Sequence, residues 1–127
     1  MTDYTIERLH DPDALFVHIT PTFTASKSLK PYYEEMIIWL DKEPAPIETI
    51  IDMTNAHIVF NELLTATNAM QDIGNDPNQH HNNIGFILIT DSRMMKLAME
   101  GLHKLGIITR VRVVNSVDDA LALIKAS

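Results

Sequence analysis

The sequence contains no cysteine, and this absence removes three kinds of chemistry. Disulfide bonds, thiolate catalysis and cysteine-based metal sites all need a side chain that the chain lacks. A protein without disulfides suits a reducing compartment, so we expect a cytoplasmic protein. Glycine is scarce as well: the four glycines form no Gly-x-Gly or Walker pattern, so we expect no glycine-rich loop that holds nucleotide phosphates.

Clusters of positive charge are also absent. The chain has 10 lysines and arginines against 17 aspartates and glutamates, which gives a formal charge of −7. Because phosphate backbones and anionic surfaces repel such a chain on average, we expect no nucleic-acid partner. Arg110 and Arg112 form the densest basic spot, and this local patch suits a small anion.

Long hydrophobic runs are missing too. No stretch approaches the roughly 20 apolar residues that a membrane-spanning helix needs. Residues 1–10 are polar and of mixed charge, unlike the basic start and apolar run of a signal peptide. We therefore expect no membrane insertion.

The residues that are present indicate one globular domain. The chain has 127 residues, close to the commonest domain size, so we expect a single domain over residues 1–127. Apolar residues make up 46% of the chain and charged residues 21%, which is typical of a protein with a packed core and far from the composition of disorder.

The first half predicts a β-hairpin, a helix and a central strand. Residues 4–9 and 15–19 are extended segments joined by a turn around Pro12. Ser26 or Ser28 is expected to cap a helix that ends before residues 44–46, where two prolines lie. A β-branched strand follows over residues 47–53. The core-facing residues of the helix are predicted to be Leu29, Tyr32, Met36, Ile37 and Leu40.

The second half predicts three more helices and two more strands. A helix is expected from Asn61 to Ile73, and residues 84–89 form a continuously apolar strand. Asp91 or Ser92 caps the third helix, and residues 111–113 alternate as in a strand near an edge. A capping box at Ser116 begins the last helix. The third helix is predicted to bury Met94, Leu97, Ala98, Gly101, Leu102 and Leu105.

The resulting order is β-β-α-β-α-β-α-β-α. Strands that alternate with helices imply parallel pairing through right-handed crossovers, and the opening hairpin makes the sheet mixed. We therefore predict an α/β fold with about five strands and about four helices.

This order resembles the STAS domain of anti-sigma-factor antagonists, within the SpoIIAA-like superfamily. In those proteins the third strand leads into a stretch of the form Asp-Leu-Ser-x-Val-x-Phe-Ile-Asp-Ser-Ser-Gly, which contains a phosphorylatable serine. Residues 52–63 follow the first half of that pattern, with Asp52, Met53 and Thr54 similar in character. In the second half Phe60 replaces the aspartate and Asn61 replaces the serine. The resemblance implies a regulatory, protein-binding module without serine phosphorylation.

Our first functional hypothesis is a non-catalytic module that binds a protein partner or a second copy of itself as a homodimer. Met95 and Met99 of the third helix would extend an apolar patch if they are exposed. The residues assigned to partner binding are Thr54, His57, Ile58, Val59, Phe60 and Asn61.

A second hypothesis, which the resemblance implies, is a pocket for a small apolar or anionic ligand, as in a lipid carrier. A third is a small hydrolase or lyase that uses Asp52 and His57 at the end of a strand. We favour neither over the first. The hydrolase is disfavoured because an aspartate at a strand end more often caps a loop than acts in catalysis. His80 and His81 have Asp76 as their one nearby carboxylate, whereas a closed metal site needs three or four ligands. We expect no catalytic residue, metal or other cofactor.

Overall fold

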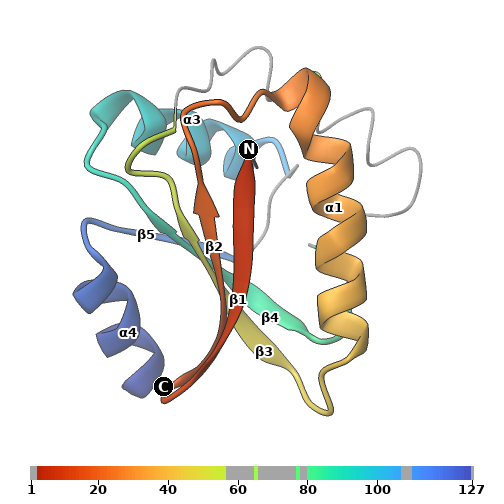
Figure 1. Cartoon of the computed structure of the whole chain (residues 1–127). Coiled ribbons are helices and arrows are strands. Elements are labelled where there is room, and N and C mark those ends of the chain that lie inside the picture. The colour runs from red at the N-terminus through yellow and green to blue at the C-terminus, as the bar shows by residue number, and fades with distance from the viewer. Residues whose placement is uncertain (1–2, 57–64, 66–76, 78–79, 107–109, 127) are drawn as a thin grey trace.

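A mixed five-stranded sheet forms the centre of the molecule. The computed structural model describes residues 3–56, 65, 77, 80–106 and 110–126 (Figure 1). The strands lie in the order β1-β2-β3-β4-β5. β1 and β2 form the predicted antiparallel hairpin, and the remaining neighbours are parallel. Their bounds are β1 Tyr4–His10, β2 Asp13–Ile19, β3 Ile47–Asp52, β4 Asn83–Ile89 and β5 Val111–Val114.

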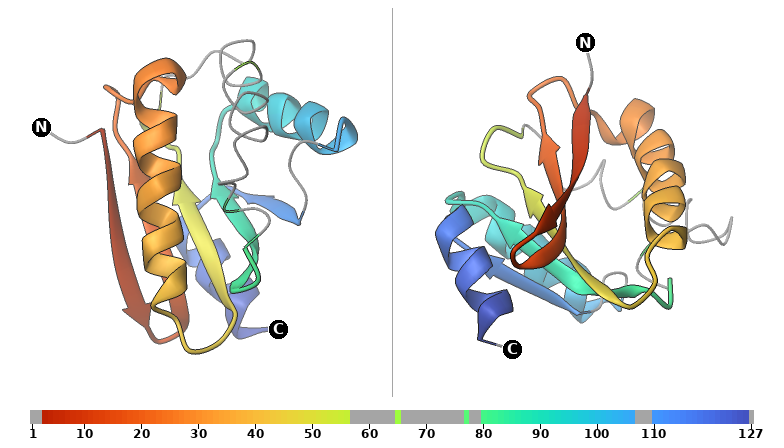
Figure 2. Two further views of the ribbon diagram at one scale, coloured as in Figure 1. Left: turned by 90° about the vertical axis from the view of Figure 1, so that its right-hand side faces the viewer. Right: turned by 60° about the horizontal axis from the view of Figure 1, so that its bottom comes forward.

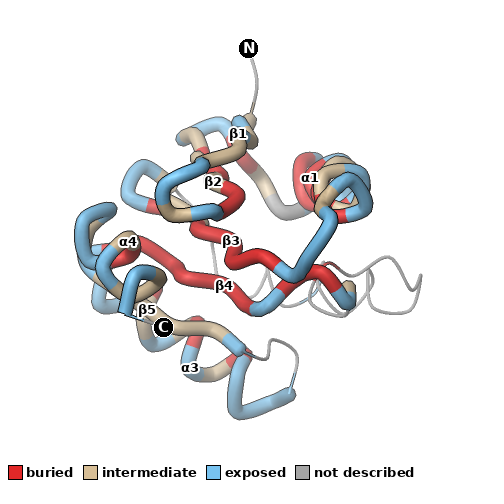
Figure 3. Tube along the Cα trace, turned by 90° about the horizontal axis from the view of Figure 1, so that it is seen from below, coloured by how far each residue is buried: buried red, intermediate tan, exposed pale blue. Residues whose placement is uncertain are grey.

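Helices cover both faces of this sheet. In the described part of the chain they are α1 (Ala25–Asp41), α3 (Arg93–Lys104) and α4 (Val117–Lys125). α1 and α3 contribute to one core cluster and α4 to the other, so α4 lies alone on its face among the described helices (Figures 2 and 3). The mixed α/β prediction is confirmed. Of the helix expected from Asn61 to Ile73, Thr65 alone is described, and it is helical; the rest of the range lies outside the described residues.

The larger core lies between the sheet and α1. Met36 and Leu40 of α1 are fully buried against Leu15 and Val17 of β2, and these residues belong to one cluster. The predicted α1 stripe is largely confirmed, since Leu29, Tyr32, Met36 and Leu40 are buried while Ile37 is half-buried. None of the described helices is long and apolar enough to cross a membrane.

The start of α1 differs from the prediction. The N-cap residue is Thr24 rather than Ser26 or Ser28, and its own side chain makes no capping hydrogen bond. Instead the Ser28 Oγ accepts a hydrogen bond from the Thr24 backbone N–H at 3.1 Å and donates one to the Asp3 carboxylate at 2.7 Å. The helix therefore begins earlier because the N-terminal strand supplies a partner that local sequence does not reveal.

The face that α3 buries also differs from the prediction. Met95, Met99 and Leu102 are buried, whereas Met94 and Leu97 are exposed. The predicted burial of Met94, Leu97 and Leu105 is wrong, since all three are exposed, and Met95 and Met99, which would have extended an apolar patch if exposed, are buried. The helix carries apolar residues around more than half of its circumference, so its sequence offers two possible buried faces, and packing against the sheet selects one.

Candidate functional site

The carboxyl ends of the parallel strands meet at one edge of the sheet, where α/β proteins usually place their sites (Figure 1). β2 ends at Ile19, β3 at Asp52 and β4 at Ile89. The backbone N–H of Met53 bonds to the Ile89 carbonyl at 2.9 Å, so the segment after β3 stays beside the segment that leads into α3. This edge is the candidate functional site.

Asp52 holds the segment after β3 in place. Its Oδ1 accepts hydrogen bonds from the Thr54 backbone N–H at 3.0 Å and from the Thr54 hydroxyl at 2.6 Å. Its Oδ2 lies 3.4 Å from the His18 Nδ1. The carboxylate thus caps the loop through one oxygen and contacts a histidine through the other, as an aspartate in an Asx-type turn does.

His18 is a site residue that the sequence reasoning missed. In the β2–β3 register His18 pairs with Asp52, so their side chains lie on the same face of neighbouring strands. Aligning the carboxyl ends of the two predicted strands would have revealed this pair. His57, which we had paired with Asp52, lies outside the described residues, as do Ile58, Val59, Phe60 and Asn61. Thr54 is exposed at this edge, as its proposed role requires.

The start of α3 lies at the same edge and is fixed by two side chains. The predicted cap Ser92 accepts a hydrogen bond from the Met95 backbone N–H at 3.2 Å. The buried Thr90 hydroxyl accepts one from the Ser92 N–H at 3.1 Å. These contacts fix where the first turn of α3 begins.

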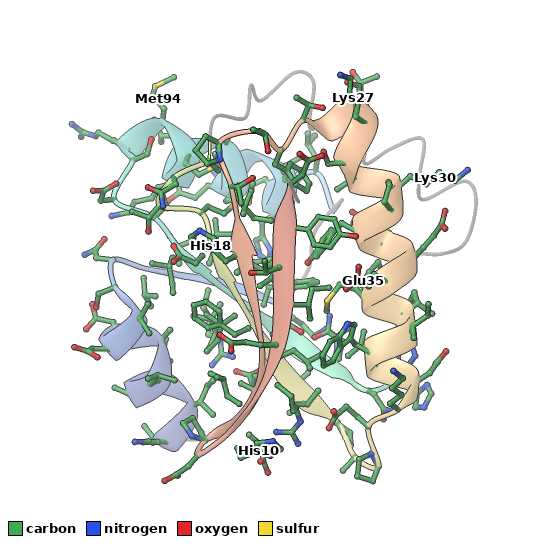
Figure 4. The ribbon with its side chains drawn as sticks, in the orientation of Figure 1. His10, His18, Lys27, Lys30, Glu35 and Met94 are labelled. Atoms are coloured by element: carbon green, nitrogen blue, oxygen red, sulfur yellow. The ribbon has the colours of Figure 1, made fainter. Side chains whose placement is uncertain are left out.

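Three apolar side chains are exposed along one stripe of α3 and its C-cap residue, Leu105. They are Met94, Leu97 and Leu105, with 77%, 56% and 64% of their surfaces accessible, and we call them the α3 apolar face. Met94 points away from the molecule, as Figure 4 shows. Scattered exposed apolar residues are ordinary on a protein surface, but three on one helix stripe are typical of a contact surface.

The charge of α3 is opposite to that of the chain. Arg93, Lys96 and Lys104 outnumber Glu100, so α3 carries +2 while the whole chain carries −7. The remainder of the chain therefore carries −9. A cationic helix with an exposed apolar stripe gives this surface a defined chemistry, one suited to acidic and apolar groups.

His80 is a structural residue in this fold. Its Nδ1 accepts a hydrogen bond from the Asn82 backbone N–H at 3.0 Å, and its Nε2 lies 2.7 Å from the Asp41 carboxylate at the end of α1. Both ring nitrogens are engaged, and the ring stacks on His81. No group of three potential metal ligands occurs among the described residues. His80 thus links the loop before β4 to the end of α1.

No family model and no curated protein gives a significant match to the chain. A solved structure does: an uncharacterised protein of the DUF3478 family with a SpoIIAA-like fold, from Shewanella loihica PV-4. The two share 17% sequence identity with a TM-score of 0.59, over 95% of this chain and 91% of that chain. The chain therefore has a SpoIIAA-like α/β fold, as its sequence pattern predicts.

Proposed function

We propose that the chain is a non-catalytic module that binds an acidic protein partner at the carboxyl edge of its sheet. The observation that carries this proposal is the α3 apolar face, Met94, Leu97 and Leu105, exposed on a folded helix. Burying exposed apolar surface is the main favourable term in protein association. Thr54, one of the residues assigned to partner binding from sequence, follows β3 at the same edge.

The charge of α3 defines the partner's chemistry. A net positive helix on a net negative protein attracts acidic surfaces to one place and repels them elsewhere. The partner that fits is an acidic segment with apolar anchors, such as an amphipathic helix that lies along α3. We expect its association rate to fall as salt is added, because rim charges act mainly on encounter.

The arrangement at Asp52 supports a binding role over a catalytic one. The Asp52 Oδ1 accepts two hydrogen bonds from Thr54, so this oxygen holds the loop after β3 in place. The His18 contact at 3.4 Å is an ion-pair distance between groups on adjacent strands, and both serve to shape the edge. We therefore propose that Asp52 and His18 position the interaction surface.

Two variants at comparably exposed apolar positions test the proposal. Ile38 of α1 and Leu97 of α3 are similarly exposed, at 54% and 56%, but lie on different helices. We expect wild type and Ile38→Asp to capture the same acidic protein from a lysate of the source cell and Leu97→Asp to lose it. The captured protein is then purified and titrated, and its affinity for Leu97→Asp should be weaker by about tenfold or more. Equal affinity for all three proteins would overturn the proposal.

The alternative occupant of the α3 apolar face is a second copy of the chain. Light scattering of purified protein at tens of micromolar gives its mass directly. A monomeric mass would mean that no second copy covers the α3 apolar face, as the proposal requires. A dimer that Leu97→Asp dissociates and Ile38→Asp does not would make a second copy the occupant and replace the acidic partner.

A further inference from the structure

A pocket of about 500 Å³ lies at the opposite edge of the sheet, where the parallel strands begin. This volume is in the range of small-molecule sites. Its walls include Ile47 of β3, Ile84 of β4 and Ile124 of α4, and its polar groups include Glu48, Arg110 and Arg112. Ile84 is 46% exposed, so the pocket has an accessible apolar wall.

An ion pair in this pocket leaves part of its hydrogen-bonding capacity unused. The Arg112 Nη2 donates to the Glu48 Oε2, linking β5 to β3 across β4. The Glu48 side chain is 8% exposed, and its Oε1 is buried without a hydrogen-bond partner in the described part of the structure. A buried carboxylate oxygen without a donor is costly, so this atom favours a ligand that donates. Arg112 has five N–H donors, and a single bond from it is recorded among the described residues.

Gly85 explains how these two side chains meet. In the β3–β4 register Glu48 pairs with Gly85, so the strand between the two charged residues adds no side chain at that level. A Cβ at Gly85 would lie 2.6 Å from the Arg110 carbonyl oxygen, so no other residue fits without displacing the backbone. β4 therefore has no side chain of its own beside Glu48, and Arg112, which pairs with Ile87, reaches Glu48 diagonally across β4.

We propose that this pocket binds a small zwitterion with an apolar side chain, an apolar α-amino acid being the simplest example. The ammonium group donates to the Glu48 Oε1 and the carboxylate accepts from the Arg112 guanidinium. The side chain packs on Ile84 and Ile124. Because Glu48 and Arg112 lie side by side, one recognises the ammonium of the ligand and the other its carboxylate. An apolar groove alone would recognise neither group. The site is at the other edge of the sheet and does not depend on the proposed partner.

Titration of ¹⁵N-labelled protein with L-leucine and L-phenylalanine tests this assignment by NMR. We expect saturable shifts of the Gly85, Val111 and Arg112 amide signals with at least one of the two amino acids. Two analogues of leucine separate its charged groups: 3-methylbutan-1-amine lacks the carboxylate and 4-methylpentanoate lacks the ammonium. Each should bind about tenfold more weakly or worse, because one buried charge stays unpaired. Absence of shifts with both amino acids, or equal binding of leucine and its analogues, would overturn the proposal.

Variants locate the site. Glu48→Gln should lose most of the leucine-induced shift, whereas Glu34→Gln, on the exposed surface of α1, should bind as wild type does. Because Glu48→Gln also removes an ion pair and can fail to fold, Ile84→Trp is the second variant. It fills the pocket from a half-exposed position and should abolish binding while the protein stays folded. Unchanged binding by folded Glu48→Gln or by Ile84→Trp would contradict the assignment.

Discussion

Tyr4 joins the first strand to the first helix through both its ring and its hydroxyl. The hydroxyl donates to the Glu35 carboxylate at 3.0 Å, and Glu35 reaches from α1 toward β1 (Figure 4). The ring packs edge-to-face on Phe23 and Tyr32, with centroids 6.3 and 5.5 Å away. Partial burial, followed by the hydrogen bond to Glu35, raises the Tyr4 pKa to about 12 from its ordinary value of 10.0.

This raised pKa makes stability fall in alkali. The folded protein keeps the Tyr4 proton between pH 10 and 12 while the unfolded chain releases it, so the stabilisation is complete below pH 10 and is lost as the pH rises through about 12. We predict that the free energy of unfolding declines less steeply over this range in Tyr4→Phe than in wild type. Urea denaturation at several pH values measures the difference, and parallel curves would refute the prediction.

Gly85 is the residue at which a single methyl group should matter most. Its Cβ would meet the Arg110 carbonyl oxygen, and that oxygen accepts the Phe86 N–H at 2.9 Å, which fixes the β4–β5 contact. We predict that Gly85→Ala destabilises the protein by about 1–3 kcal/mol through overpacking. Gly106→Ala is the comparison, because Gly106 has open space and a φ of 75°, so its cost is backbone strain of about 1 kcal/mol. Equal midpoints for Gly85→Ala and wild type in urea would exclude the steric argument.

Residue-level chemistry was predictable where it depends on local sequence. Ser116 was predicted as a cap and Ser92 as one of two candidate caps with Asp91, and in the structure Ser92 and Ser116 are the caps. The His18–Asp52 contact and the Asp3–Ser28 bond were missed, because each joins residues that lie far apart in the chain: the first pair meets through strand register, and the second joins the residue before β1 to α1. The pattern within one element does not by itself show which residues of another element lie beside it.

Helix caps provide a prediction at the scale of elements. The Ser92 and Ser116 side chains each accept a backbone N–H, at 3.2 and 3.1 Å, whereas the Thr24 side chain makes no capping bond. Ser92→Ala and Ser116→Ala should each lower the free energy of unfolding by about 1 kcal/mol, and Thr24→Ala should change it by less. Chemical denaturation of the three variants checks the order, which a larger loss in Thr24→Ala would reverse.

The buried face of α3 could not be predicted from the sequence pattern. A stripe through Met94, Leu97 and Leu105 and a stripe through Met95, Met99 and Leu102 are both apolar, and helical periodicity does not rank them. The structure buries the second stripe and exposes the first. The sequence located the helix and its cap but assigned Met94 and Leu97 of the exposed stripe to the core.

At the scale of the whole molecule, the sheet presents two edges with different chemistry. The carboxyl edge combines Thr54 with the exposed face of a cationic helix, and the amino edge contains the Glu48–Arg112 pair beside apolar walls. The topology was predictable because alternating strands and helices allow few arrangements, and the match over 95% of the chain confirms it. The function was not predictable from the topology, since unrelated functions share one fold.

The rate at which Met94 is oxidised by peroxide, free and in complex with the captured partner, tests the central claim most directly. Methionine oxidation follows exposure, and Met94 is 77% exposed while Met95 and Met99 are 8% and 5% exposed. We predict that Met94 is oxidised much faster than the other two in the free protein and is protected in the complex. A Met94 that reacts equally fast in both states would contradict a partner seated on α3.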